Sequence, residues 1–215
     1  MKGATAKDAS LKVQMIFQDP YASLNPRMRV KEIIGEAPRV NQIVPSDEID
    51  DYIDDVMIRG GMDHGFKRRY AHQFSGGQRQ RIGIARALAV KPDFLVCDEA
   101  VAALDVSIQA QIRNLFMTLR EDLKLTYLFI SHDLAVVERI AHRVAVMYLG
   151  QIVELGSREQ VFRNPRHSYT KRLLGAVPIA DPRQRTERPL LTGEIPSPVW
   201  PAGEGPELVT YTEVE

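Results

Sequence analysis

Two acids and a histidine stand where short apolar runs of the sequence end. Asp98 and Glu99 directly follow the run 94–97, and His132 follows the run 127–130 after one serine. Such runs are typical of strands buried on both faces, and ligands of open parallel sheets bind where the strands end. An aspartate there can hold Mg²⁺ against nucleotide phosphates, and a glutamate can deprotonate an attacking water. Taken singly, solvated acids and a structural histidine are the plainer interpretation.

A glycine pair opens a predicted helix. The segment Ser75-Gly76-Gly77-Gln78 precedes helical residues that extend from Gly77 to Val90. The two glycines allow close backbone approach, and the free N–H groups of a helix start suit a phosphate oxygen. The Ser75 hydroxyl adds a donor. By itself the segment is equally well interpreted as an ordinary helix start, and Gln18, which follows another apolar segment, means nothing alone.

Alternating strands and helices must position these residues. The first predicted elements are a strand at 94–97, an amphipathic helix with apolar residues from 108 to 119, and a second strand at 127–130. A helix at 134–141 and a strand at 144–149 follow, and this strand has a hairpin partner at 151–154. A capping box at 157–160 then opens a short helix. This alternation favours an α/β fold with a parallel sheet core. Prolines accumulate after residue 164, which predicts a short helix and then an extended tail.

The composition is that of an ordinary globular domain. The 215 residues include 28 Lys+Arg and 28 Asp+Glu, so the formal net charge is zero, and 44% are hydrophobic. The basic surplus of a nucleic-acid-binding protein is absent. No run approaches the roughly 18 apolar residues of a membrane span. The single cysteine, Cys97, cannot form an internal disulfide, which favours a reducing, cytosolic compartment.

In their order, these motifs resemble the ATP-binding cassette of ABC transporters. The matching positions are Gln18 for the Q-loop, Ser75–Gln78 for the signature motif, Asp98–Glu99 for the Walker B segment, Asp105 for the D-loop and His132 for the switch histidine. The stretches 17–27, 164–170 and 193–198 are similar to di- and oligopeptide importer ATPases, and importers for nickel share much of them. The resemblance covers about residues 13–198 and implies a partial P-loop NTPase-like fold.

The resemblance implies ATP and Mg²⁺ as cofactors and a role for each matched residue. Glu99 would be the catalytic base, and His132 would stabilise the transferred phosphate. Asp98 and Gln18 would serve the metal. The residues implied in nucleotide binding, most of them on ATP held by a second cassette, are Gln18, Ser75, Gly76, Gly77, Gln78 and Asp105.

It also implies partners and a domain plan. The partners would be a second ABC ATPase subunit in a homo- or heterodimer, integral membrane permease subunits and, indirectly, a periplasmic or extracellular solute-binding protein. The protein would be cytoplasmic and peripheral on the inner face of the cell membrane. Residues 1–156 would form the partial ATPase domain, with a helical subdomain at about 25–90, and residues 157–215 an importer-type extension and tail.

One family motif has no match in the sequence. A P-loop, G-x-x-x-x-G-K-[ST], grips the β- and γ-phosphates and should precede Gln18, but none does. The segment Gly60–Gly65 has the glycine spacing, but Phe-Lys-Arg follows it, which predicts a turn. Ala100 and Ala102 replace the usual proline and serine or threonine, both tolerable changes. The expectation is a cassette truncated before the Q-loop that alone neither holds ATP tightly nor hydrolyses it.

Three other interpretations stay open. The chain could be a non-catalytic partner that donates Ser75–Gln78 to the nucleotide of an intact cassette, or an inert gene fragment. A DNA-repair or chromosome-maintenance ATPase with an ABC-like head is disfavoured, because the sequence has neither coiled-coil heptads nor a basic surplus.

Overall fold

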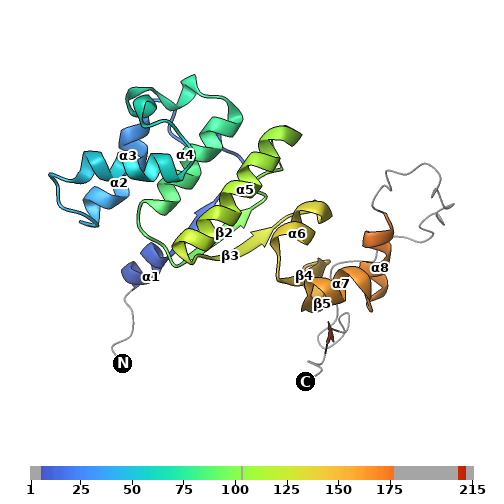
Figure 1. Ribbon diagram of the computed structural model, residues 1–215. Coiled ribbons are helices and arrows are strands. Elements are labelled where there is room, and N and C mark those ends of the chain that lie inside the picture. Colours follow the sequence, from blue (N-terminus) through green and yellow to red (C-terminus); the bar gives the residue numbers. More distant parts are fainter. Residues whose placement is uncertain (1–5, 103, 177–207, 212–215) are drawn as a thin grey trace. The chain divides into compact units, whose positions relative to one another are not determined.

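The computed structural model describes residues 6–102, 104–176 and 208–211 (Figure 1). The chain forms two compact units, residues 1–133 and residues 134–215. They are therefore described one at a time. This division, between residues 133 and 134, comes earlier in the chain than the domain boundary expected between residues 156 and 157. The expected domain boundary stays a prediction.

A parallel sheet forms the centre of the first unit. Its strands β1 (Val13–Ile16), β2 (Phe94–Asp98) and β3 (Thr126–Ile130) lie side by side in that order. The short helix α1 (Ala6–Lys12) leads into β1. Because all three strands run the same way, their carboxyl ends meet at one edge. The α/β class with a parallel core is confirmed, and the apolar segment before Gln18 belongs to that core.

Side-chain burial differs between the two faces of this sheet. Helix α5 (Val106–Leu123) covers one face, where its fully buried Phe116 packs edge-on against Phe129 with 5.8 Å between ring centres (Figure 1). On the other face, Leu128 and Ile130 of β3 are 50% and 44% exposed. The prediction that this strand is buried on both faces is therefore wrong for the described part of the chain. An unbroken apolar run does not show which of its faces is covered.

A group of helices lies between β1 and β2 in the chain. It consists of α2 (Val30–Val40), α3 (Ile49–Arg59), the 3₁₀ helices η1 (His64–Arg68) and η2 (Ala71–Gln73), and α4 (Gly76–Leu88). Fully buried Ile34, Ile53 and Ile82 form part of its core. Helix α4 was expected at 77–90 and begins and ends slightly earlier. This group occupies the stretch in which the resemblance implies a helical subdomain.

The second unit is built on an antiparallel hairpin. Helix α6 (Leu134–Ile140) precedes β4 (Arg143–Tyr148), which pairs with β5 (Gln151–Ser157). The hairpin is confirmed, but β4 does not join the parallel sheet as the strand–helix alternation suggested. The loop residues Leu149 and Gly150 have φ values of 48° and 81°. Positive φ at both positions is the geometry of a two-residue antiparallel turn, which accounts for the pairing of β4 with β5.

Two short helices and a third strand complete this unit. The predicted capping box is present: the Gln160 N–H donates to Ser157 Oγ at 3.2 Å and opens α7 (Arg158–Arg163). Helix α8 (Ser168–Gly175) is the short helix expected before the tail. Most of the predicted tail lies outside the described residues. Its end nevertheless forms β6 (Val209–Thr210), which pairs in parallel with β5 and was not predicted.

No helix among the described residues is long and apolar enough to cross a membrane.

Candidate functional site

Glu99 lies at the carboxyl edge of the parallel sheet between two predicted site residues. Gln18, which follows β1, donates from Nε2 to Glu99 Oε2 at 2.6 Å. His132, which follows β3, contacts Glu99 Oε1 through Nδ1 at 2.8 Å. The Glu99 N–H donates to the carbonyl of Ile130 at 3.0 Å, which ties the end of β2 to that of β3. The structure thus brings together Glu99 and His132, which the strand ends placed at one edge, and Gln18, which the family resemblance assigned to the same site.

Both oxygens of the Glu99 carboxylate therefore accept hydrogen bonds. Because a carboxylate only accepts, Nδ1 of His132 carries the hydrogen of that contact. The hydrogen bond that His132 donates to Glu99, and next the attraction of the negative charge of Glu99, raise the pKa of His132 above the ordinary histidine value. The His132 side chain is 72% exposed and that of Glu99 24%. The imidazole can thus meet a ligand from solvent while holding the carboxylate in place.

This contact predicts a titration result. Glu99→Gln should lower the pKa of His132 toward its ordinary value of about 6.5, because the acceptor charge is lost. In the unchanged chain the contact is strongest just below the His132 pKa, where the imidazole is charged, and it weakens as the pH rises through that pKa. NMR titration of the ring Cε1–H measures this. Glu121→Gln, at an exposed position of α5, is the control. An unaltered His132 pKa in Glu99→Gln would contradict the contact.

Asp98 is the last residue of β2 and shares the carboxyl edge with Glu99. Side chains alternate along a strand, so Asp98 lies on the sheet face opposite Cys97. Among the described residues no three His, Cys, Asp or Glu side chains are grouped to hold a metal. Mg²⁺ is commonly bound by one or two carboxylates together with phosphate oxygens, and a single aspartate at this edge fits such a site. Metal binding by Asp98 and Gln18 stays a prediction.

The signature segment begins α4 with a reciprocal cap. The Gln78 N–H donates to Ser75 Oγ at 3.4 Å, and the Ser75 N–H donates to Gln78 Oε1 at 3.1 Å. The hydroxyl expected to serve a ligand thus caps the helix, and the spacing of serine and glutamine signals such a box in the sequence. The N–H groups of Gly76 and Gly77 have no partner within the helix, because the first turn of a helix offers none.

The loop that follows β1 packs against α4. The guanidinium carbon of Arg79 lies 4.0 Å from the ring centre of Tyr21. Arg86 donates from NH1 to the carbonyl of Ser23 at 2.7 Å. Burial lowers the pKa of Arg86 below its ordinary value. Sequence reasoning missed these contacts, because nothing in a helical arginine tells which distant carbonyl it will meet. The Gln18 loop and the signature helix are therefore packed together.

Asp105 is the residue before α5, and its side chain makes no capping hydrogen bond there. Its backbone carbonyl accepts from the Gln109 N–H at 2.8 Å. The implied place of Asp105 at a dimer interface stays a prediction.

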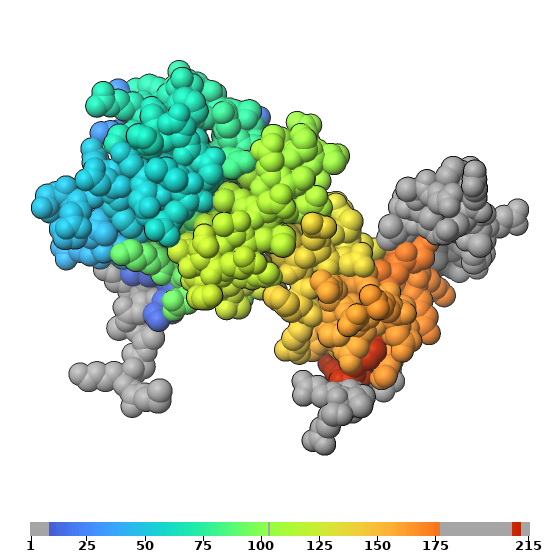
Figure 2. All heavy atoms as spheres, in the orientation of Figure 1, coloured from blue at the N-terminus to red at the C-terminus, as the bar shows by residue number. Residues whose placement is uncertain are grey.

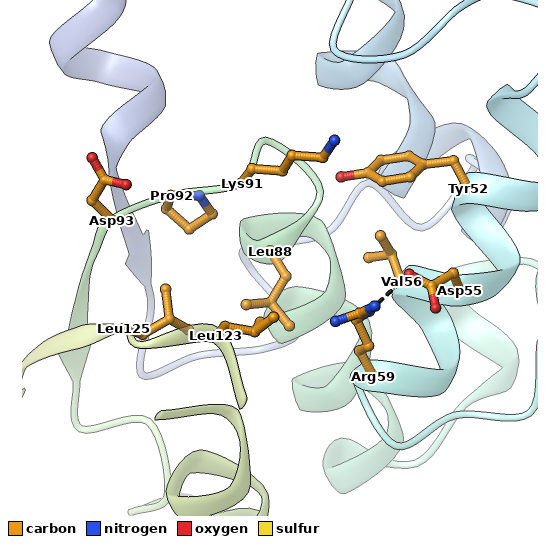
Figure 3. Close-up of a pocket in the computed structure, with 10 residues that line it drawn as sticks. All are labelled: Tyr52, Asp55, Val56, Arg59, Leu88, Lys91, Pro92, Asp93, Leu123 and Leu125. Carbon is orange, nitrogen blue, oxygen red and sulfur yellow. Dashed lines mark hydrogen bonds and ion pairs between the residues drawn. The ribbon is translucent and has the colours of Figure 1, made fainter. Parts of the chain in front are cut away.

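A pocket of about 440 Å³ lies at the opposite end of the sheet, where β2 and β3 begin (Figure 3). Leu88 and Leu125 give it apolar walls, and Lys91 lies above the Tyr52 ring with 5.3 Å between Nζ and the ring centre. None of the predicted site residues lines it. It is therefore separate from the edge that carries Glu99.

Comparison with known proteins identifies the family. Residues 1–102 match the family model described as "ABC transporter", and residues 153–203 match "Oligopeptide/dipeptide transporter, C-terminal region". The chain belongs to the ABC transporter family. The resemblance stated from the sequence motifs is confirmed, and Gln18, the signature segment and Glu99 all lie within the first matched range.

Several relatives of this ABC protein share the same name. The chain is 51% identical over 215 residues to the glutathione import ATP-binding protein GsiA of Pectobacterium atrosepticum, a match that covers all of the chain and 34% of the relative. It is 55% identical over 193 residues to GsiA of Escherichia coli strain K12, which covers 89% of the chain and 31% of the relative. The chain spans about a third of the length of these relatives.

A solved structure supports the fold. The structure of cbiO1 from Clostridium perfringens, part of the ABC transporter complex cbiONQ, is similar with a TM-score of 0.65 and 30% sequence identity. The match covers 72% of this chain and 60% of that one. The expected ABC cassette fold is confirmed over the matched part.

Proposed function

We propose that this chain is part of the ATP-hydrolysing subunit of an importer for small peptides. The observation that carries the proposal is the contact of Gln18 and His132 with the two carboxylate oxygens of Glu99 at the sheet edge. The match of residues 153–203 to the oligopeptide/dipeptide transporter region supports a peptide substrate. The GsiA relatives favour glutathione, which is itself a tripeptide, within that class.

In this proposal each residue at the edge has one task. Glu99 accepts a proton from the attacking water; each carboxylate oxygen has two lone pairs, so it can do this while bound to its neighbours. The exposed His132 ring, in its charged form, donates from Nε2 to the transferred phosphate while Nδ1 stays bound to Glu99, and Gln18 fixes the carboxylate. Asp98 would hold Mg²⁺, which supplies positive charge against the phosphate oxygens. The first turn of α4 offers its free N–H groups to ATP on a second cassette.

The described residues include Asp98 and Gln18, which fit the metal-binding part of such a site, and the signature segment Ser75–Gln78. They include no segment that fits a cradle for the β- and γ-phosphates. No P-loop sequence occurs in the 215 residues. The nearest spacing match, Gly60–Gly65, forms the predicted turn: Gly60 follows α3, Gly61 has a φ of 72°, and η1 begins at His64. Hydrolysis by this chain therefore requires a P-loop-bearing segment joined to it.

The same proposal includes the partners. A second ATP-binding subunit would receive the signature segment, and membrane permease subunits would hold the protein at the cytoplasmic face of the membrane. A solute-binding protein would deliver the peptide to those permeases. A second candidate function is a non-catalytic cassette that only donates its signature segment. The complete capping box at Ser75–Gln78, which forms the segment that such a cassette would donate, favours it.

An ATPase assay on two proteins tests the proposal. One is the 215-residue chain, and the other is the same chain joined to a P-loop segment of an ABC relative. We expect hydrolysis only from the joined protein, because the several donors of the cradle act together on the phosphates. Replacement of the P-loop lysine by alanine is the control. Hydrolysis by the shorter chain would refute the need for a cradle, and an inactive joined protein that still dimerises with ATP would favour the non-catalytic role.

A further inference from the structure

The end of the chain docks on the second unit as a strand. Val209 pairs with Glu154, and Thr210 pairs with Leu155, in a parallel register that adds β6 to β5. Figure 2 shows this segment in red against the orange residues of the same unit. Only a short strand is involved, so backbone pairing alone gives little specificity. The side chain of the next residue, Tyr211, supplies more.

The Tyr211 hydroxyl reaches three oxygen acceptors. It lies 2.6 Å from Glu154 Oε1, 2.6 Å from the carbonyl oxygen of Asn164 and 3.2 Å from that of Gln160. Glu154 is fully buried, a rare state for a glutamate that does not have several hydrogen-bond donors around it. The hydroxyl is thus the donor that a pocket of acceptors requires.

Other groups already orient the Glu154 carboxylate. It accepts from the N–H of Arg166 at 2.8 Å and from the N–H of His167 at 3.2 Å. Burial raises the pKa of Glu154, but these and other hydrogen bonds outweigh it and hold the pKa below its ordinary value. Burial, and next the Glu154 hydrogen bond, raise the pKa of Tyr211 to about 12. At neutral pH a neutral phenol therefore donates to a charged carboxylate, which is a strong kind of hydrogen bond.

The Tyr211 ring lies in a slot that exists because residue 156 is glycine. A Cβ atom built at Gly156 would lie 2.6 Å from Cδ2 of the ring, closer than real contacts allow. The guanidinium of Arg166 covers the ring at 4.4 Å from its centre. The ring also packs against the buried cluster that contains Val153. The slot thus matches both the flat ring and its hydroxyl.

We infer that β5, Gly156 and Glu154 form a peptide-binding site that recognises an extended segment with a tyrosine. Its occupant is the chain's own Leu208–Tyr211 segment. Main-chain pairing with β5 aligns the segment, and the slot selects the tyrosine side chain. In recognition by strand addition, main-chain hydrogen bonds likewise supply affinity and side-chain pockets supply specificity. This site belongs to the second unit and does not depend on ATP hydrolysis.

The site can be tested by opening it in the full-length chain. Tyr211→Ala removes the side chain that fills the slot, and a fluorescent peptide of residues 205–213 then serves as the probe. We expect this peptide to bind the Tyr211→Ala chain at least ten-fold more tightly than the unchanged chain, whose own segment competes at high effective concentration. A peptide with phenylalanine in place of the tyrosine should bind about ten-fold more weakly or worse. Adding Gly156→Ala to the Tyr211→Ala chain should abolish binding.

A matched control and a second measurement keep the test decisive. Leu208, in the same segment, is 49% exposed, so Leu208→Ala should not open the site. In the full chain, Tyr211→Phe should speed hydrogen exchange of residues 208–211 about ten-fold, whereas Leu208→Ala should not. Equal peptide binding to the unchanged and Tyr211→Ala chains, equal affinity of the phenylalanine peptide, or unchanged exchange in Tyr211→Phe would each overturn the inference.

Discussion

Glu99→Gln should lower ATP hydrolysis by the chain joined to a P-loop segment about 100- to 10,000-fold, the usual contribution of a general base. The amide of glutamine cannot take a proton from water. It also replaces the acceptor that now holds Gln18 at 2.6 Å and His132 at 2.8 Å. ATP binding should persist, because Glu99 is not among the residues expected to hold the phosphates. Initial rates and nucleotide affinity, measured on the same preparation, separate the two effects.

The control for this variant is Glu121→Gln, which makes the same chemical change at an exposed position of α5. It should leave the hydrolysis rate unaltered. A Glu99→Gln protein that kept more than a tenth of the rate would show that another group takes the proton. In that case the contact with His132 would serve only to order the loop.

The predicted site cluster follows from a general property of parallel sheets. Asp98 and Glu99 end one strand and His132 follows its neighbour, so a parallel register had to bring them to one edge. Nothing more than apolar runs and their ends was needed to predict this. The individual contacts were out of reach, because the side-chain partners of Glu99 depend on rotamers and on the positive φ of 46° at that residue.

The errors in the fold concern choices that local patterns leave open. A strand–helix–strand pattern does not say which sheet the next strand joins, and β4 belongs to the sheet β4-β5-β6 and not to the parallel sheet of β1, β2 and β3. Strand β6 was missed because its partner β5 is far away in the chain. The hydrogen bond between Tyr211 and Glu154 spans 57 positions. Contacts of that range have no local sequence signal.

A glycine at position 77 of the signature segment has two possible physical reasons, the approach of a ligand and the packing of α4 against α5. Gly77 was predicted to let a ligand approach, but its absent side chain also makes room for α5: a Cβ there would lie 2.6 Å from Cγ2 of Ile108. That methyl group belongs to a β-branched side chain with few rotamers, so it cannot simply swing aside. Packing between α4 and α5 therefore requires glycine at this position, whatever the ligand.

Two glycine variants in α4 distinguish packing against α5 from ligand approach as the reason for glycine at position 77. Gly77→Ala should destabilise the first unit by about 1–3 kcal/mol through overpacking against Ile108. Gly83→Ala should stabilise it by up to about 1 kcal/mol, because alanine is the better helix former and a Cβ at Gly83 meets nothing within 4 Å. Urea unfolding measures both. Shifts of the same sign would contradict the packing argument. If Gly77→Ala instead reduced hydrolysis by the joined protein without altering its unfolding, the glycine would serve the nucleotide alone.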